Sequence, residues 1–217
     1  MNIDLFGNKI KNKSYRALRH DITRSKQKAN SIETHHPDYK INQINSYLVG
    51  NKSLPEKDKV KILELFAGRG NLTKIYDNIG KVEAYDKTHL KTGDSYKVFH
   101  KLIYKRKKYN IIDLDPYGFP NRFFPDIFLL IDKGFLIITM PKPYVNILNG
   151  ITKTHLSSYY GVYNPSKMQV IERICTWGLC HWRKVTLLNT VKFDKMWRFL
   201  FEVEKVKATD YTGVKNK

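Results

Sequence analysis

The stretch ILELFAGRGNLT, residues 62–73, decides the fold class of this chain. A short apolar run ends at Glu64, a turn with Gly68 and Gly70 follows, and residues of helical character come next. Glycines allow a tight backbone turn and let a ligand lie directly against the main chain. The pattern G-x-G is informative here because it lies between a strand and a helix. Thr73 stands where the dinucleotide pattern G-x-G-x-x-G needs a third glycine, which disfavours NAD.

Strand-like and helical segments alternate along most of the chain after residue 59. The expected strands are Lys61–Leu65, Lys81–Tyr85, Tyr109–Leu114 and Gly134–Met140, and the helices between them are Asn71–Ile79, Tyr96–Lys107 and Phe124–Lys133. Apolar strands that alternate with helices are typical of a parallel sheet covered on both faces. After a helix at Ser166–Leu179, the runs Trp182–Leu188 and Arg198–Val206 suit an antiparallel pair at the sheet edge. The sequence therefore predicts an α/β, Rossmann-like fold with a mostly parallel sheet and a C-terminal antiparallel pair.

The chain is strongly basic, with 39 Lys and Arg against 20 Asp and Glu and a formal net charge of +19. Such an excess attracts polyanions, so nucleic acid is the expected partner; a compositional bias toward Lys is the alternative. Residues 1–30 contain 8 basic and 2 acidic side chains, and Tyr15, Leu18 and Ile22 repeat at helical spacing, which predicts a basic amphipathic helix. The residues expected to contact nucleic acid are Arg16, Arg19, Arg24, Lys26 and Lys28.

Three regions follow from the change of pattern along the chain. Residues 1–59 are expected to form a basic, mainly helical N-terminal extension, residues 60–207 the α/β domain, and residues 208–217 a basic tail. Within the extension, a second helix is expected to begin at an Asp38 cap and to stop at Gly50.

Neither a membrane segment nor a metal site is expected. No stretch approaches the roughly 20 apolar residues that span a bilayer, and the start MNIDLFGNK lacks the apolar region of a signal peptide. Cys175 and Cys180, the only cysteines, lack the paired spacing of a zinc site, and Cys175 is expected to be a packed core thiol. These features predict a cytoplasmic protein without a metal.

Two acidic residues stand at positions that suit an adenosine ligand. Asp86 ends the second expected strand, about 20 residues past the glycines, where a carboxylate commonly binds ribose hydroxyls. Asp94, in TGDSY, ends the position of a third strand, where a carboxylate could accept a hydrogen bond from an adenine amino group. The alternative for each is an ordinary loop carboxylate that caps a helix, and Asp94 suits an N-cap.

A second motif, DLDPYGFP, occupies residues 113–120 at the carboxyl end of the next strand. Together, ILELFAGRGNLT, VEAYD, TGD and DLDPYG resemble, in order and spacing, the class I S-adenosylmethionine-dependent methyltransferases. DPYG is similar to the D/N-P-P-Y/F motif of enzymes that methylate exocyclic amino groups of bases. The longer string IIDLDPYGFP is most similar to the tRNA guanine-N2 methyltransferases of the Trm-one type, whose motif is D-x-D-P-F-G-S-P. The resemblance covers about residues 60–142.

The resemblance implies a class I methyltransferase fold with S-adenosylmethionine as the cofactor. Glu64 would border the methionine end of the cofactor, Asp86 would hold its ribose, and Asp94 would bind its adenine amino group. The residues implied to form the wall beside the cofactor are Phe66, Ala67, Gly68 and Gly70.

The same resemblance implies roles for the residues of DPYG. Asp115 would accept a hydrogen bond and a proton from the target amino group, Tyr117 would stack on a flipped-out base, and the Pro116 backbone would shape the pocket. An exocyclic amine is a poor nucleophile because its lone pair is delocalised into the ring. An acceptor for its protons favours the pyramidal form that can attack a methyl group.

The sequence also departs from the family pattern. The second Pro of D-P-P-Y is absent, and Phe119 stands where the tRNA enzymes tend to have Ser. The large C-terminal domain of those tRNA enzymes has no counterpart up to Lys217, so their substrate does not transfer directly. The expected activity is N-methylation of a nucleic-acid base, with RNA (a tRNA-like guanine N2) preferred. The alternatives are a DNA adenine-N6 or cytosine-N4 methyltransferase of a mobile element, and a catalytically silent, cofactor-binding subunit that binds nucleic acid, with or without a partner chain.

Overall fold

The computed structural model describes residues 37–116, 118–143, 150–193 and 195–206. The chain divides into two compact units, Met1–His35 and His36–Lys217, and the described residues belong to the second. The predicted basic helix of residues 1–30 lies outside the described residues. The same holds for Tyr117, for the tail 208–217 and for the five basic residues predicted to contact nucleic acid: Arg16, Arg19, Arg24, Lys26 and Lys28.

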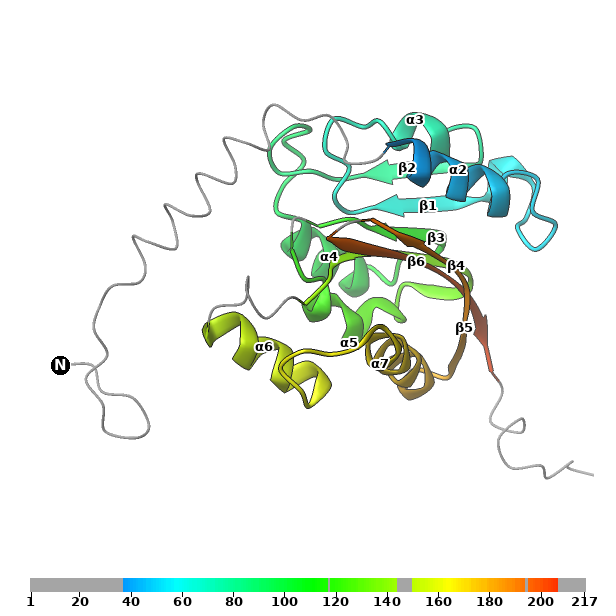
Figure 1. Ribbon diagram of the computed structural model, residues 1–217. Helices are drawn as coiled ribbons and strands as arrows, with labels where there is room; N and C mark the ends of the chain where they lie inside the picture. The colour runs from blue at the N-terminus through cyan, green and yellow to red at the C-terminus, as the bar shows by residue number, and fades with distance from the viewer. Residues whose placement is uncertain (1–36, 117, 144–149, 194, 207–217) are drawn as a thin grey trace, which may run out of the picture. The chain divides into compact units, whose positions relative to one another are not determined.

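A six-stranded sheet forms the centre of this unit, with the strand order β2-β1-β3-β4-β6-β5 (Figure 1). The strands are β1 (Lys61–Glu64), β2 (Lys81–Ala84), β3 (Tyr109–Leu114), β4 (Ile131–Pro141), β5 (Arg183–Lys192) and β6 (Met196–Lys205). The pairs that join β1 to β2, β1 to β3 and β3 to β4 are parallel, whereas β6 is antiparallel to both β4 and β5. The predicted parallel sheet with a C-terminal antiparallel pair is therefore confirmed.

Helices cover both faces of the sheet (Figure 1). One face carries α2 (Pro37–Tyr47) and α3 (Thr73–Tyr76); the other carries α4 (Ser95–Tyr104), α5 (Phe124–Ile127), α6 (Gly150–Tyr160) and α7 (Lys167–Cys180). Short 3-10 turns occupy Lys57–Lys59 and Asn121–Phe123. No helix in the described part of the chain is long and apolar enough to cross a membrane.

Alternation along the strands separates two apolar clusters. Along β3, Ile111 packs with the cluster of the α2 and α3 face, whereas Ile112 and Leu114 pack with the opposite cluster. The first cluster includes Ile44 and Leu48 from the α2 region, together with residues of four strands. Burial of apolar surface stabilises a fold by about 25 cal/mol per Å². The buried side chains of Ile44 and Leu48 therefore hold α2 against the sheet.

The domain boundary therefore differs from the one predicted at residue 59. The segment from Pro37 onward, with α2 and the loop behind it, belongs to the compact unit His36–Lys217 and packs on the sheet. The sequence pattern missed this because a weakly amphipathic helix does not indicate which surface it covers.

Several predicted elements differ in length, and the helix predicted at Asn71–Ile79 is only the short α3. The helix predicted at Phe124–Lys133 ends at Ile127, and β4 begins already at Ile131, where it pairs with Tyr109 across a register irregularity. Asp94, which was expected to end the position of a third strand, follows a loop, because residues 85–94 have no strand pairing. That loop offers the sheet little apolar surface, since Leu90 is 39% exposed.

Candidate active site

The glycine turn, residues 67–70, joins β1 to α3 in a left-handed backbone conformation. Gly68 and Gly70 have φ values of 56° and 78°, a region that side chains with a Cβ rarely adopt. The amide of Ala67 donates to the Tyr85 carbonyl at 3.0 Å, which ties the turn to the end of β2. A Cβ added at Gly68 would meet no atom within 4 Å. Gly68 is therefore required by its φ, and the space beside it is open to a ligand.

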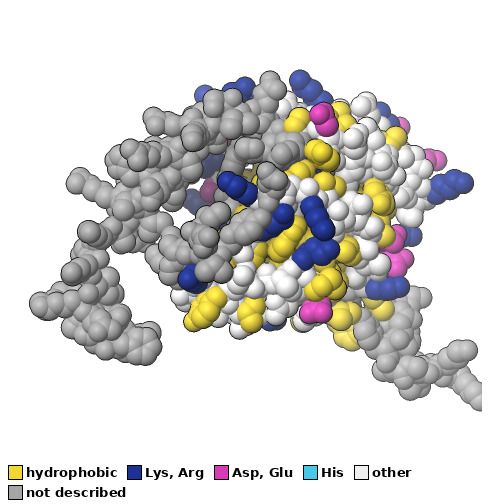
Figure 2. All heavy atoms as spheres, viewed as in Figure 1, with side chains coloured by type: hydrophobic (Ala, Val, Ile, Leu, Met, Phe, Trp, Pro, Cys, Tyr) yellow, Lys and Arg dark blue, Asp and Glu magenta, His cyan; other side chains and the backbone are white. Residues whose placement is uncertain are grey.

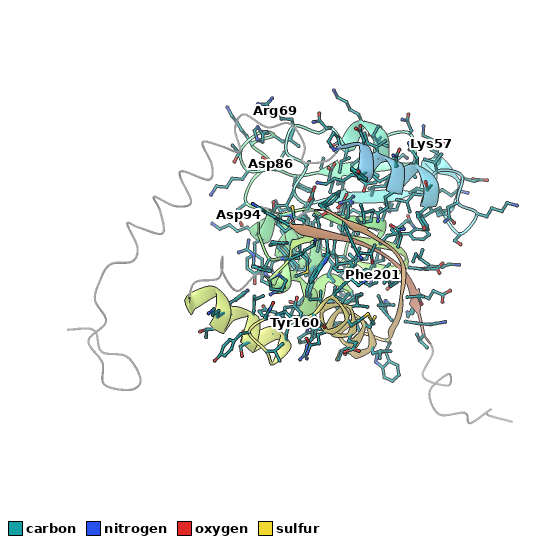
Figure 3. The ribbon with its side chains drawn as sticks, in the orientation of Figure 1. Lys57, Arg69, Asp86, Asp94, Tyr160 and Phe201 are labelled. Carbon is teal, nitrogen blue, oxygen red and sulfur yellow. The ribbon has the colours of Figure 1, made fainter. Side chains whose placement is uncertain are left out.

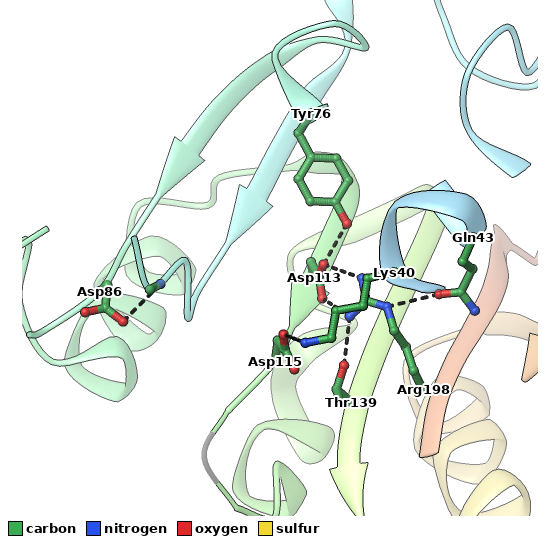
Figure 4. A network of polar contacts seen from close by, with 9 residues as sticks. Lys40, Gln43, Tyr76, Asp86, Asp113, Asp115, Thr139 and Arg198 are labelled. Carbon is green, nitrogen blue, oxygen red and sulfur yellow. Dashed lines mark hydrogen bonds and ion pairs between the residues drawn. The ribbon is translucent and has the colours of Figure 1, made fainter. Parts of the chain in front are cut away.

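Asp86 follows β2 and connects the glycine turn to the next loop. One carboxylate oxygen accepts the Gly68 amide at 3.2 Å, and the other accepts the amides of Thr88 and His89 at 2.8 and 2.7 Å. The Asp86 amide donates to the Thr92 hydroxyl at 2.8 Å, which closes the loop. Asp86 thus shapes the turn that it was predicted to accompany, and its carboxylate lies beside Gly68 (Figure 4).

Asp94 caps α4. Its Oδ1 accepts the amides of Tyr96 and Lys97, both at 3.1 Å, and the bond from the Lys97 amide is the main cause that lowers the pKa of Asp94. This is the capping geometry that was the alternative in the sequence. Figure 3 shows Asp86, Asp94 and Arg69 toward the carboxyl end of the parallel strands, whereas Lys57 lies at the opposite end.

Glu64, the last residue of β1, is 3% exposed and accepts a hydrogen bond from the Thr73 hydroxyl at 2.6 Å. Burial, followed by the nearby Asp113 carboxylate, raises the pKa of Glu64 to about 8. The ionised form is disfavoured because it is removed from water and stands beside a like charge. Glu64 is therefore largely protonated at neutral pH until a cation binds near it.

A buried polar network lies on the α2 and α3 face of the sheet (Figure 4). Asp113 and Arg198 are both fully buried, and the two guanidinium nitrogens of Arg198 reach the Asp113 carboxylate at 3.2 and 2.7 Å. Tyr76 donates its hydroxyl to Asp113 at 2.6 Å, and Arg198 donates to the Thr139 hydroxyl at 2.8 Å and to the Gln43 side chain at 3.0 Å. These five residues form the Arg198 network. It stabilises Asp113 as a charged group inside the protein.

Asp115 lies just past the end of β3, with its side chain 17% exposed. Its Oδ2 accepts a hydrogen bond from the ammonium of Lys40, a residue of α2 whose side chain is 4% exposed. Burial alone would raise the pKa of Asp115, but the charges of Lys40 and Arg198 outweigh it and hold that pKa below 3.8. Asp115 is therefore an ionised acceptor at the mouth of the sheet.

Aromatic rings border the same end of the sheet. Phe66 meets Phe123 edge to face at 5.6 Å between ring centroids, and Phe123 meets Tyr96 in the same way at 5.6 Å. The exposed Arg122 guanidinium stacks over the Tyr96 ring at 4.3 Å. Pro116 is buried and its carbonyl accepts the Gly118 amide at 2.9 Å. Phe66 and Pro116 thus stand where the site was predicted.

The predicted site residues described by the structure meet at one edge of the sheet. The ends of β1, β2 and β3 bring together Glu64, Phe66, Ala67, Gly68, Gly70, Asp86, Asp115 and Pro116. Asp94 stands at the start of α4, which is joined to the end of β1 because the Ser95 hydroxyl donates to the Leu65 carbonyl. Parallel α/β sheets bind ligands at this carboxyl edge. Among the described residues, no group of three or more His, Cys, Asp or Glu is placed to hold a metal ion.

No model of a known protein family matches the sequence, and no curated protein sequence matches it. The structure is similar to that of Trm1 from Pyrococcus horikoshii in complex with S-adenosyl-L-methionine, with a TM-score of 0.58 and 13% identity over 80% of this chain. The chain has the class I methyltransferase fold. It spans 57% of the length of that Trm1 chain. A magnesium protoporphyrin IX methyltransferase from Synechocystis PCC 6803 with bound SAH matches at a TM-score of 0.47 and 13% identity, over 77% of this chain and 82% of the other.

Sequence reasoning missed Lys40, Tyr76 and Arg198, which contact the acidic residues of the motif DLDPYG. Arg198 did carry a signal, because it is the charged residue beside the apolar run Phe199–Phe201 in a segment that was expected to be a strand of the sheet. A buried arginine needs a carboxylate partner, and Asp113 was available. Lys40 carried no comparable signal, since α2 contacts the motif only through the tertiary fold.

Proposed function

We propose that this chain transfers a methyl group from S-adenosylmethionine to an exocyclic amino nitrogen of a nucleic-acid base. The observation that carries the proposal is the position of Asp115. It is an ionised acceptor at the carboxyl end of β3, the strand that lies next to β1 and its glycine turn. A hydrogen-bond acceptor beside a cofactor turn is what an amine needs in order to be aligned for methylation.

The chain's own residues fit the cofactor. Gly68 opens a space that a Cβ would enter, Asp86 places a carboxylate beside that space, and Glu64 offers a buried carboxyl that a nearby cation would ionise. Trm1 from Pyrococcus horikoshii, which has the same fold, binds S-adenosyl-L-methionine. When bound, S-adenosylmethionine supplies a methyl group activated by a positive sulfur.

The reaction asks two things of the residues around the base. The target nitrogen would bond to the methyl carbon through its lone pair while the methyl–sulfur bond breaks and its electron pair stays on sulfur, which leaves S-adenosylhomocysteine. The nitrogen would then lose one proton, to Asp115 or through it to water, so that an amine R–NH₂ becomes R–NH–CH₃. Asp115 would accept a hydrogen bond from this amine and favour its pyramidal form. An aromatic platform offsets part of the unstacking free energy of the flipped base, by about 1–3 kcal/mol per stacked base. We assign that platform to Tyr117.

Nucleic acid is the substrate class that the charge supports. The formal charge of +19 favours a polyanion, and several Lys and Arg side chains gather near the middle of the face in Figure 2. The similarity of IIDLDPYGFP to the motif of tRNA guanine-N2 methyltransferases favours RNA over DNA and the guanine amino group over others.

The test is mass spectrometry of nucleosides from tRNA, rRNA and DNA that have been incubated with the protein and isotope-labelled S-adenosylmethionine. We expect a labelled methyl group on guanosine N2. Asp115→Ala should reduce turnover by about 10²–10⁴-fold, the usual contribution of a group that assists proton transfer. Asp58→Ala, which removes an exposed carboxylate near the opposite edge of the sheet, should leave turnover unchanged. Cofactor binding without methylation of any nucleic acid would contradict the proposal and favour the silent subunit.

A further inference from the structure

Lys40 brings a positive charge from α2, outside the strand–helix core, to the acid of the motif. Its side chain is 4% exposed, and its ammonium donates to Oδ2 of Asp115, 75 residues away in the sequence (Figure 4). A lysine almost never remains buried without a partner, because an ammonium loses its hydration there. The position of Lys40 is therefore coupled to Asp115.

α2 is anchored where Lys40 needs it. One turn along the helix, the side-chain oxygen Oε1 of Gln43 accepts a hydrogen bond from Arg198 at 3.0 Å, and its side-chain nitrogen Nε2 donates to the side-chain oxygen of Asn189 at 2.9 Å. Ile44 and Leu48 pack into the apolar cluster on the same face of the sheet. These contacts fix the helix on β6 and β5 and leave Lys40 little freedom to move away from Asp115.

The charged and titratable groups that face Asp115 come from four elements. They are Lys40 of α2, Arg198 of β6, Glu64 of β1 and Asp113 of β3, which Tyr76 and Arg198 bind. Arg198 is shared with Asp113, whereas the described contacts of the Lys40 ammonium are with Asp115. Lys40 is thus the cation that engages Asp115 directly.

We propose that Lys40 is a positioning residue of the methyl-transfer site: it binds Oδ2 of Asp115 and, together with the Thr139 hydroxyl, orients this carboxylate to accept a hydrogen bond from the target amino group. The proposal rests on the proposed function. Without the ammonium, burial would favour the protonated carboxylic acid, which donates a hydrogen bond where the amine needs an acceptor. Lys40 therefore maintains both the charge and the orientation of Asp115, and it makes α2 part of the site.

The direct test needs no substrate. The side-chain carboxyl carbon of Asp115 is followed by ¹³C NMR during a pH titration of the full chain with S-adenosylhomocysteine. In the wild type we expect no titration of Asp115 above its ordinary pKa of 3.8. In Lys40→Met the midpoint should be about 1–3 pH units higher, the usual effect of losing a close opposite charge, and Lys40→Arg should restore the wild-type behaviour. An unchanged midpoint in folded Lys40→Met would overturn the proposal.

The kinetic test uses the substrate identified by the nucleoside analysis. For Lys40→Met, kcat should fall by about tenfold for each pH unit below the new midpoint of Asp115 and should recover above that midpoint, because the ionised fraction falls about tenfold per pH unit there. The wild type should show no such fall over the same pH range. Lys40→Arg should keep an intermediate to full rate. Lys57→Met, which removes an exposed lysine at the opposite edge, is the charge-matched control. A Lys40→Met enzyme that is faster than the wild type would also overturn the proposal, since Lys40 would then block Asp115.

These two readouts separate the possible failures. If the wild type methylates no nucleic acid, the proposed function fails while the NMR titration still measures the hold of Lys40 on Asp115. If the wild type is active and both the titration midpoint and the pH profile are unchanged in Lys40→Met, the inference about Lys40 fails alone. A double variant, Lys40→Met with Asp115→Asn, should be no slower than Asp115→Asn, because the two residues act through one contact.

Discussion

At the scale of single residues, Gly68 is needed for its backbone conformation and not because space is lacking beside it. Its φ of 56° is unfavourable for any residue with a Cβ, by about 1–2 kcal/mol, yet the position of that Cβ is unobstructed. Gly50 has the same combination, with a φ of 69° and no atom within 4 Å, but lies beyond the C-terminal end of α2, away from the carboxyl edge.

We therefore predict that Gly68→Ala and Gly50→Ala lower the free energy of unfolding by similar amounts, about 1–2 kcal/mol each. Gly68→Ala should in addition weaken the binding of S-adenosylhomocysteine by at least tenfold, since its methyl group enters the space assigned to the ligand. Denaturant unfolding and calorimetry measure the two effects. Equal cofactor affinity in the two variants would show that no ligand lies against Gly68.

How much of the site could be predicted depends on where each residue's partners lie in the sequence. Gly68 and Asp86 belong to local strand-end patterns that the sequence shows directly, and Asp115 lies in a motif with a known resemblance. Lys40 and Arg198 act across 75 and 85 residues, so their roles exist only after the sheet has formed. Asp94 was open between two roles, and its contacts in the structure are those of a cap.

At the scale of elements, the Arg198 network joins β3, β4 and β6 to α2 and α3. Asp113 and Thr139 reach Arg198 from neighbouring strands, while Gln43 and Tyr76 reach the same pair from the helices above. A buried ion pair gains little over an apolar replacement, but it is costly to break, since the remaining charge stays desolvated. The main effect of the network is therefore to fix the positions in which these helices and strands pack together, and its net contribution to the free energy of unfolding is small.

Arg198→Met should accordingly lower the free energy of unfolding by about 3–5 kcal/mol, because Asp113 would remain buried without its cation. Adding Asp113→Asn to this variant should recover a large part of the loss, as the uncompensated charge disappears while Tyr76 can still donate to the amide oxygen. Urea unfolding of the two variants measures this difference. A double variant that is less stable than Arg198→Met would show that the Asp113 charge is stabilised by other groups.

The elements themselves were predictable where burial dictates their pattern. β3 has the predicted bounds, because its apolar run is buried on both faces. The helix predicted at Phe124–Lys133 was too long, because apolar residues of a short buried helix and of a following strand cannot be separated by periodicity. Gly134 lies within β4, where β4 packs closely against β3: a Cβ at Gly134 would come within 1.9 Å of the Asn110 carbonyl oxygen. α6 was not predicted at all, as GITKTHLSSYY has a weak apolar period.

At the scale of the whole molecule, the charge is shared between the N-terminal segment and the sheet domain. Residues 1–30 carry 8 basic and 2 acidic side chains, a net charge of +6, so deleting them leaves +13 of the total +19. Because the chain divides at His35, the deletion lies within the first compact unit and spares the second. The electrostatic contribution of the segment can therefore be measured with the site left in place.

Deleting residues 1–30 should make nucleic-acid binding less dependent on salt. Each neutralised phosphate contributes about 0.7–0.9 to the slope of log affinity against log salt, so five phosphate contacts would account for about 3.5–4.5. These contacts are the ones predicted for Arg16, Arg19, Arg24, Lys26 and Lys28. The affinity for S-adenosylhomocysteine should stay unchanged, because the glycine turn and its partners belong to the second unit.

A charge-matched variant distinguishes a local footprint from general attraction. Six exposed cations at or near the amino edge of the sheet can be neutralised together, again removing +6: Lys52, Lys57, Lys81, Lys105, Arg106 and Lys133. If the N-terminal segment holds the phosphates, this variant should bind with nearly the wild-type salt slope while the deletion binds with a much shallower one. The reverse ranking would place the nucleic acid along the amino edge. Since that edge is opposite Asp115, it would also argue against the base entering the site proposed here.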